Sequence, residues 1–118
     1  MSSSTLRHLA RLRARYGVEV RVTRNGNSLT LDAVPAKSTA KVVGGDGSFS
    51  VLTIDDWLIA VCDWPRIDDI PYPLKGDEIS VGGIPYIVTH PDQNTPVFSN
   101  FNQLDRPAVV WRVHSMQN

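Results

Sequence analysis

The stretch that decides the fold runs from Pro73 to Thr89 and reads PLKGDEISVGGIPYIVT. Within it, Gly82 and Gly83 separate two apolar runs. Adjacent glycines supply the positive φ that a type I′ turn requires at both of its central positions. The stretch therefore predicts a β-hairpin. Lys75-Gly76-Asp77 before it predicts the tight turn that starts the first strand.

Such a short turn sets which residues of the two strands lie opposite each other. The expected pairs are Val81 with Ile84, Ile79 with Tyr86, and Asp77 with Val88. Because side chains alternate along a strand, one face is expected in the core and carries Ile79, Val81, Ile84, Tyr86 and Val88. Pro85 falls opposite Ser80 at a non-hydrogen-bonded pair, and its missing N–H points away from the partner strand. This predicts a sheet edge or a bulge there.

Length and composition restrict the class of protein. The chain has 118 residues, a formal net charge of zero and one cysteine, Cys62. This length predicts a single domain over residues 1–118. Zero net charge argues against a whole-molecule nucleic-acid or membrane binder and suits association with copies of itself. One cysteine excludes an intrachain disulfide, and without a signal core or a long apolar run we expect a soluble cytoplasmic protein.

The N-terminal segment predicts an amphipathic helix over about residues 4–16, capped by hydroxyl residues and ended by Gly17. Its apolar arc is expected to carry Leu6, Leu9, Leu12 and Tyr16. The opposite arc carries a stripe of arginines at i, i+4 spacing, Arg7, Arg11 and Arg15. This stripe is either a solvated helix face or a contact for phosphates or an acidic partner surface.

Two strands are expected directly after the helix. Residues 18–24 alternate cleanly, 25–28 form a turn, and 29–34 return as the second strand, which Pro35 ends. The side chains expected to point inward are Val18, Val20, Val22, Leu29 and Leu31.

The remaining segments predict further short strands. A short apolar run at 41–43 and a flexible loop at 44–48 precede a strand at 49–54. Residues 55–62 fit a helix or a strand, and their β-branched and aromatic residues favour the strand. A closing strand is expected over 108–114. One helix and about seven strands over residues 18–114 predict a mainly β fold, a small barrel or sandwich.

The polar segment 91–107 is expected to be a loop, yet it contains Phe98 and Phe101. The two aromatic side chains are either anchors for a partner or part of a lid that closes one end of the barrel. We expect this segment to order on contact with a neighbouring copy, giving a ring of identical subunits.

No catalytic or cofactor fingerprint is visible. Three histidines are scattered without the spaced partners of a metal site, His8, His90 and His114. The adjacent acids Asp55-Asp56 and Asp68-Asp69 are expected to be capping or solvated rather than an acid–base pair. Cys62 fits a small buried residue. We therefore expect no enzymatic activity, no cofactor and no metal.

Four groups of residues in the second half of the chain carry a resemblance to a known family. They are Asp56-Trp57-Leu58-Ile59, Pro73-x-Lys75-Gly76-Asp77-x-Ile79, Gly83-x-x-Tyr86-x-Val88 and Trp111-Arg112-Val113-His114. In order and spacing they resemble the head-tail joining proteins of tailed bacteriophages, the neck or head-closure ("stopper") class.

The resemblance implies a structural subunit without enzymatic activity that assembles as a ring between portal and tail and holds DNA in the head. Its implied partners are copies of itself, the portal or adaptor and tail proteins, and packaged DNA in the channel. Its implied place is the neck of the virion, after synthesis in the host cytoplasm. The resemblance itself assigns no interface residue; from the arginine stripe and the two aromatic side chains we expect partner interfaces at Arg7, Arg11, Arg15, Phe98 and Phe101.

Other classes of function stay open at this point. Lys75-Gly76-Asp77-x-Ile79-x-Val81 also resembles the SH3-like barrels that bind nucleic acids. Such a site is expected to interleave basic and stacking aromatic residues, whereas Lys75 is the one basic residue of the hairpin. Another tail or capsid component and a small enzyme are the remaining alternatives.

Overall fold

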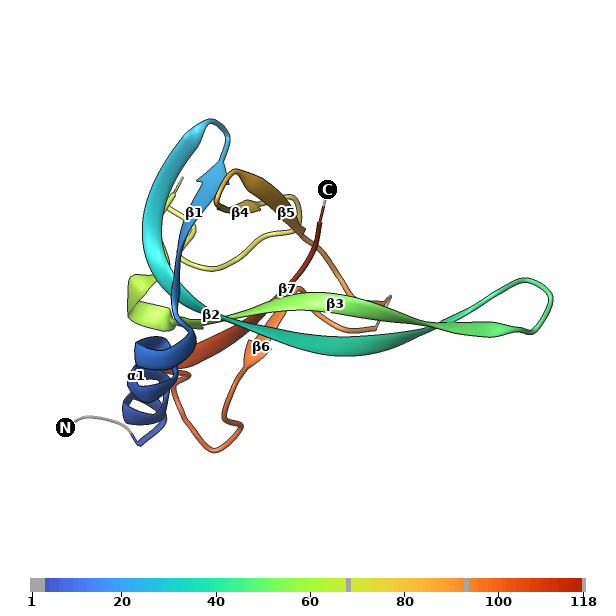
Figure 1. Ribbon diagram of the computed structural model, residues 1–118, viewed down its shortest axis with the longest axis horizontal. Coiled ribbons are helices and arrows are strands. Elements are labelled where there is room, and N and C mark those ends of the chain that lie inside the picture. The colour runs from blue at the N-terminus through green and yellow to red at the C-terminus, as the bar shows by residue number, and fades with distance from the viewer. Residues whose placement is uncertain (1–3, 68, 93, 118) are drawn as a thin grey trace.

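The computed structural model describes residues 4–67, 69–92 and 94–117. Its elements are α1 (Ser4–Tyr16), β1 (Val18–Arg24), β2 (Asn27–Val43), β3 (Phe49–Ala60), a 3₁₀ turn η1 (Val61–Asp63), β4 (Glu78–Val81), β5 (Ile84–Val88), β6 (Phe98–Asn100) and β7 (Val110–Gln117). Six strands close into an antiparallel barrel in the order β3-β2-β1-β4-β5-β7, and β7 pairs with β3 (Figure 1). β6 adds to β7 outside this ring. The prediction of a mainly β barrel of about seven strands with one N-terminal helix is confirmed.

The hairpin of β4 and β5 forms in the predicted register, with Ile79 opposite Tyr86 and Val81 opposite Ile84. Gly82 and Gly83 have φ values of 56° and 85°, as a type I′ turn requires. Ile84 is an exception to the predicted core face, because its side chain is exposed. β5 pairs with β7 only from Tyr86 onward among the described residues, so no strand covers the first residues after the turn.

The helix packs on the outside of the barrel. Leu9 is buried and, with Leu6 and Leu12 beside it, forms an apolar layer against β2, β3 and β7. Tyr16, expected on this arc, is exposed, because it lies at the last residue of the helix. The chain then turns at once into β1, and a Cβ on Gly17 would lie 2.5 Å from the carbonyl oxygen of Arg13.

The first two strands meet at a tighter turn than predicted. Asn25 and Gly26 alone form it, with φ values of 51° and 80°, so β2 begins at Asn27 rather than at residue 29. Val20 and Val22 point inward and are buried as expected. Leu29 is exposed instead, because it lies beside the turn at the end of the barrel.

β2 is much longer than predicted and passes through Pro35. It pairs with β1 only as far as Ala33, which lies opposite Val18, and beyond that point it pairs with β3. Pro35 therefore lies where β1 no longer neighbours the strand, so its missing N–H breaks no bond to β1. The prediction that Pro35 ends the strand is wrong, and residues 41–43 are the end of the same strand.

β3 confirms the strand interpretation of residues 55–60, but the strand predicted to continue to Cys62 ends at Ala60. Trp57 and Ile59 point into the barrel, whereas Leu58 and Ala60 belong to the layer under the helix. Burial on both faces explains the continuous apolar run.

The C-terminal part also differs from the prediction. The expected loop at 91–107 contains the short strand β6, and the closing strand is β7 at Val110–Gln117 rather than 108–114. β7 is central because it pairs with β3, β5 and β6. The buried side chains of the barrel interior are Val20, Val22, Ala33, Trp57, Ile59, Trp64, Ile79, Val88, Val97 and Val113.

Candidate assembly surfaces

The long strands β2 and β3 leave the barrel together and form a two-stranded arm, residues 36–54 (Figure 1). The pairing of β3 with β7 ends at Asp55, opposite Ser115, and the pairing of β2 with β1 ends at Ala33. Beyond these points the described strands of the arm neighbour only each other. Within the arm Ala40 and Ile54 are buried, but its strand edges have no neighbouring strand among the described residues and residues 43–53 are exposed, the situation in which a sheet readily accepts another chain.

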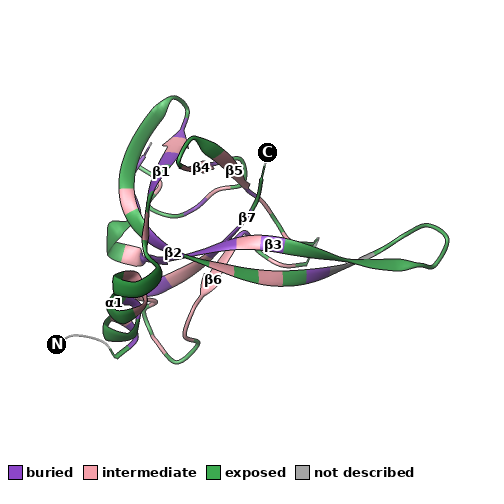
Figure 2. Ribbon diagram, in the orientation of Figure 1, coloured by how far each residue is buried: buried purple, intermediate pink, exposed green. Residues whose placement is uncertain are grey.

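Three apolar residues share one face of the arm tip, on which Lys41 lies opposite Val51. Val43 lies opposite Phe49, and Val51 lies two residues further along the same face. Their exposed fractions are 72% for Val43, 64% for Phe49 and 59% for Val51. Figure 2 shows the same contrast, with the barrel part of β3 buried and the outer part of the arm exposed. Adjacent exposed apolar side chains mark an interaction site more often than scattered ones do.

The root of the arm is held by a polar cluster around Asp56. Its carboxylate is fully buried and accepts a hydrogen bond from Arg112 Nε at 2.6 Å, and its other oxygen lies 2.8 Å from His114 Nδ1. His114 is the residue directly opposite Asp56 in the β3–β7 pair, and its ring is nearly as buried. Arg112 also donates to the carbonyl oxygen of Lys37 on β2, at 3.1 Å.

The charge of Asp56 follows from this cluster. Burial alone would raise the pKa of its carboxyl. Hydrogen bonds with His114, Arg112 and Ser38 outweigh burial, so the pKa of Asp56 lies below its usual value. The carboxylate is therefore ionised at neutral pH and holds β2, β3 and β7 together by charge-assisted bonds.

Further bonds join the same three strands at the root. Lys37 Nζ lies 2.8 Å from a carboxylate oxygen of Asp55, and this bond raises the pKa of Lys37. Trp57 Nε1 donates to Ser115 Oγ, which in turn donates to the carbonyl oxygen of Asp55. So many fixed bonds indicate that the arm leaves the barrel in a defined direction.

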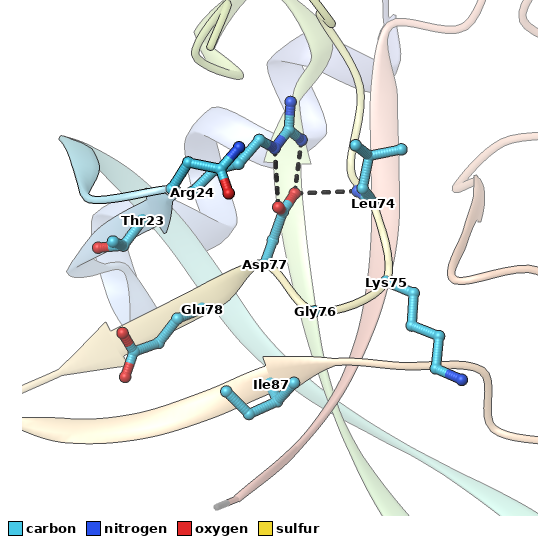
Figure 3. Close-up of a pocket in the computed structure, with 9 residues that line it drawn as sticks. Thr23, Arg24, Leu74, Lys75, Gly76, Asp77, Glu78 and Ile87 are labelled. Atoms are coloured by element: carbon cyan, nitrogen blue, oxygen red, sulfur yellow. Dashed lines mark hydrogen bonds and ion pairs between the residues drawn. The ribbon is translucent and has the colours of Figure 1, made fainter. Parts of the chain in front are cut away.

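A second buried ion pair lies at the other side of the barrel, between Arg24 at the end of β1 and Asp77 before β4 (Figure 3). The two contacts are bidentate, at 2.8 Å and 2.6 Å, and the side chains are only 6% and 3% exposed. Arg24 also donates to the carbonyl oxygens of Ile67, Ile70 and Tyr72. The pair therefore anchors the long connection between η1 and β4 to the barrel.

These bonds change the interpretation of the acidic residues. The expectation that Asp56 is solvated or caps a helix is wrong, because β7 and Arg112 cover its side chain. Asp55 is partly exposed and paired with Lys37, and Asp69 is exposed. Asp68 lies outside the described residues. Neither buried carboxylate has the open, unpartnered geometry of a general acid or base, since each is occupied by arginine.

The other candidate chemical groups are dispersed. His8 stacks on Phe101 with ring centroids 6.3 Å apart, and His90 Nδ1 lies 2.9 Å from the carbonyl oxygen of Thr95. Cys62 is exposed rather than buried, because η1 leaves the barrel at that point. The described ranges bring together no group of three or more histidine, cysteine or acidic residues that could hold a metal ion. Within the same ranges, no helix has the length and apolar character to cross a membrane.

The arginine stripe lies on the outer side of α1. Arg7, Arg11 and Arg15 are exposed, while Arg13 turns back to Asp63 at 3.1 Å. Arg13 thus links the helix to the segment after β3, while the stripe lies on the exposed side of the helix. A contact of the stripe with a partner stays a prediction.

The sequence suggested that Phe98 and Phe101 lie in a docking segment that orders only on contact. In the structure both side chains are partly buried within the single chain. Phe98 is half-buried in β6 and packs 4.9 Å from the Trp111 ring, whereas Phe101 packs beside the helix layer. The exposed apolar side chain of their segment is Leu104, at 88%. Both phenylalanines contribute to packing, and a role of either one at an interface stays a prediction.

Phe98 does contribute to an aromatic groove of about 550 Å³ on the surface. The groove is lined by Val61, Cys62, Trp64, Arg66, Pro71, Tyr72, Phe98 and Trp111. The rings form a chain, with centroid separations of 6.2 Å from Tyr72 to Phe98 and 6.5 Å from Trp64 to Trp111. The groove is thus mainly apolar, with one cation at its edge.

Comparison with known proteins assigns no function, so the surfaces described above are the guide to it. The sequence matches no model of a known protein family, and no curated protein matches it.

Sequence reasoning missed the arm, the groove and both buried ion pairs, although signals for the pairs were present. Arg24 continues the alternation of Val20 and Val22, so it points inward. Asp77 was expected opposite Val88, which is a core position. A charged residue at an inward position needs a buried partner, and these two positions supply each other.

Proposed function

We propose that the protein is a structural subunit of a phage neck, in which copies assemble as a ring between the DNA-filled head and the tail and retain the DNA. The observation that carries this proposal is the arm, a rigidly rooted projection with exposed apolar residues on a closed barrel. A small domain gains nothing from such residues in water, but an assembly subunit buries them against a neighbour.

The positions that carry the family resemblance support the same proposal. Lys75-Gly76-Asp77 forms the anchored turn before β4, and Gly83 forms the hairpin turn. Trp111 to His114 lie in β7, the strand that closes the barrel and holds the root of the arm. The resemblance thus coincides with the residues that build the barrel and direct the arm. In this proposal the protein is not an enzyme and is located in the neck of the virion.

Deletion of the gene in the phage that encodes the protein tests the proposal. Electron microscopy is expected to show DNA-filled heads and separate tails, with heads that lose DNA. Addition of the purified protein to the lysate is expected to restore joined particles. Normal particles without the gene would overturn the proposal.

The arginine stripe is proposed as a contact with the neighbouring neck component. Charge reversal at Arg7, Arg11 and Arg15 is expected to leave the fold unchanged, because all three side chains are exposed. The same variant is expected to lose the ability to restore joined particles. Full restoration by it would return the stripe to an ordinary solvated helix face.

A further inference from the structure

The apolar arm tip and the aromatic groove are both interaction surfaces, and they lie far apart on one molecule. Figure 1 shows η1, which begins the groove-lining segment, at one end of the long axis and the turn of the arm at the other. The molecule extends over 52 Å along this axis. Because the root of the arm is held by the Asp56 cluster, the tip cannot fold back to the groove of its own chain.

The two surfaces match in chemistry. The tip offers Phe49 with Val43 and Val51 on one face, and the groove offers the rings of Trp64, Tyr72, Phe98 and Trp111. Aromatic side chains pack well edge to face or offset against other rings. A groove of about 550 Å³ has room for a phenylalanine and an adjacent aliphatic side chain.

Their charges match as well. Residues 43–54 contain one charged residue, Asp46, which lies in the turn at the tip. Its carboxylate accepts hydrogen bonds from the backbone and side chain of Ser48, which hold its pKa below the usual value. Arg66 is the one charged residue among those that line the groove, and it is exposed. An arm tip that enters the groove brings opposite charges together at the edge of an apolar contact.

We propose that the arm of one copy inserts Phe49 into the aromatic groove of the next copy, with Asp46 of the arm facing Arg66 of the groove. Because the tip and the groove are two different surfaces, the contact is head-to-tail and repeats from copy to copy. It closes into a ring when the rotation per step divides a full turn. This contact specifies how subunits meet in the proposed neck ring and rests on that proposed function.

The size of the contact predicts its strength. A packed phenylalanine buries about 150–250 Å², so Phe49 and its neighbours bury less than the about 800 Å² per partner of a standard interface. A single arm–groove contact is therefore weak, whereas a closed ring is stabilised by one such contact between each pair of neighbouring copies. The protein is expected to be monomeric when dilute and to associate as concentration rises.

Cys62 provides a direct test, because it is the only cysteine of the sequence and lines the groove. In the variant Val51→Cys, mild oxidation at high protein concentration is expected to give a ladder of linked chains. Mass spectrometry is expected to find position 51 of one chain joined to Cys62 of another. Leu104→Cys, at a still more accessible apolar position, is the control and is expected to give no such ladder. Equal yields from both variants, or links only between identical positions, would overturn the proposal.

Sedimentation velocity over a concentration series gives an independent test. Phe49→Asp is expected to weaken association about tenfold or more, and Leu104→Asp is expected to leave it unchanged. Asp46→Lys and Arg66→Asp are each expected to weaken association, and their combination in one chain is expected to restore it. An unchanged association in Phe49→Asp, or no rescue in the combined variant, would contradict the contact.

These outcomes separate the contact from the proposed function. If no link to Cys62 forms while the unaltered protein still joins heads to tails, the contact is wrong and the neck proposal stands. If the link forms but the protein does not restore joined particles, the neck proposal is wrong and the contact stands.

Discussion

The two halves of β3 have the same conformation and opposite surroundings. From Asp56 to Ala60 the strand lies between β2 and β7, with the barrel interior on one face and the helix on the other, and its side chains are buried. From Phe49 to Thr53 it pairs only with β2 among the described residues, and its side chains are exposed. The difference teaches that an apolar strand residue is buried only where the chain supplies neighbours. Where it does not, another chain is the natural cover.

The first prediction concerns the barrel and has the largest expected effect. Asp77→Ala leaves the Arg24 guanidinium buried without its carboxylate, which is expected to lower the free energy of unfolding by about 3–5 kcal/mol. Chemical denaturation measures this loss. Asp63→Ala removes the more exposed pair with Arg13 and is the control, with an expected loss below about 1 kcal/mol. Similar losses in both variants would contradict the anchoring role of the buried pair.

The second prediction concerns the junction of barrel and arm. Asp56 has a folded pKa below its ordinary 3.8, so its stabilising contribution is fully present above that value. The contribution is lost as the pH falls from there through the folded pKa. Asp56→Asn is expected to lower the free energy of unfolding at neutral pH by about 1.5–3 kcal/mol and to flatten its decline in acid. Denaturation at several pH values tests this, with Asp55→Asn as the control. An equally steep acid decline in Asp56→Asn would assign the decline to other groups.

The third prediction concerns the loss of stability when a glycine of the hairpin turn is replaced by a residue that resists positive φ. A Cβ on Gly83 would meet no atom within 4 Å, so a cost of Gly83→Val arises from its φ of 85° alone. The expected loss is about 1–3 kcal/mol, since β-branched residues resist the left-handed region. Gly83→Asn is expected to lose less, because asparagine tolerates positive φ. Equal melting temperatures for Gly83→Val and Lys75→Ala would contradict the type I′ turn.

The fourth prediction concerns the arm and has the smallest expected effect on stability. Phe49→Asp is expected to change the free energy of unfolding by no more than about 0.5 kcal/mol, because the side chain is largely exposed in the single chain. The half-buried Phe98 is the contrast, and Phe98→Asp is expected to lower the melting temperature clearly. Thermal unfolding of dilute protein measures both. A strongly destabilised Phe49→Asp would mean that the arm tip belongs to the fold of the single chain.

The parts of the structure that the sequence predicted are local. The helix from Ser4 to Tyr16, the strand from Val18 to Arg24 and the hairpin at Gly82–Gly83 all lie where expected. Helix caps, alternation along a strand and the φ requirements of a tight turn act within a few residues, so these signals can be interpreted without the rest of the chain. The arm and the groove were not predicted, because whether a side chain is exposed depends on segments that are distant in the sequence.

The sequence by itself determined the helix, the hairpin turn at Gly82–Gly83 and the alternation that makes the chain a β protein. Only the tertiary structure decided that β2 continues through Pro35, because this depends on where β1 ends beside it. It also decided the buried partners, since Arg24 and Asp77 are 53 residues apart in sequence. The arm and the groove arise in the same way, because whether Phe49 or Trp64 is covered depends on segments distant in the chain. Backbone geometry acts locally, whereas burial is set by non-local neighbours.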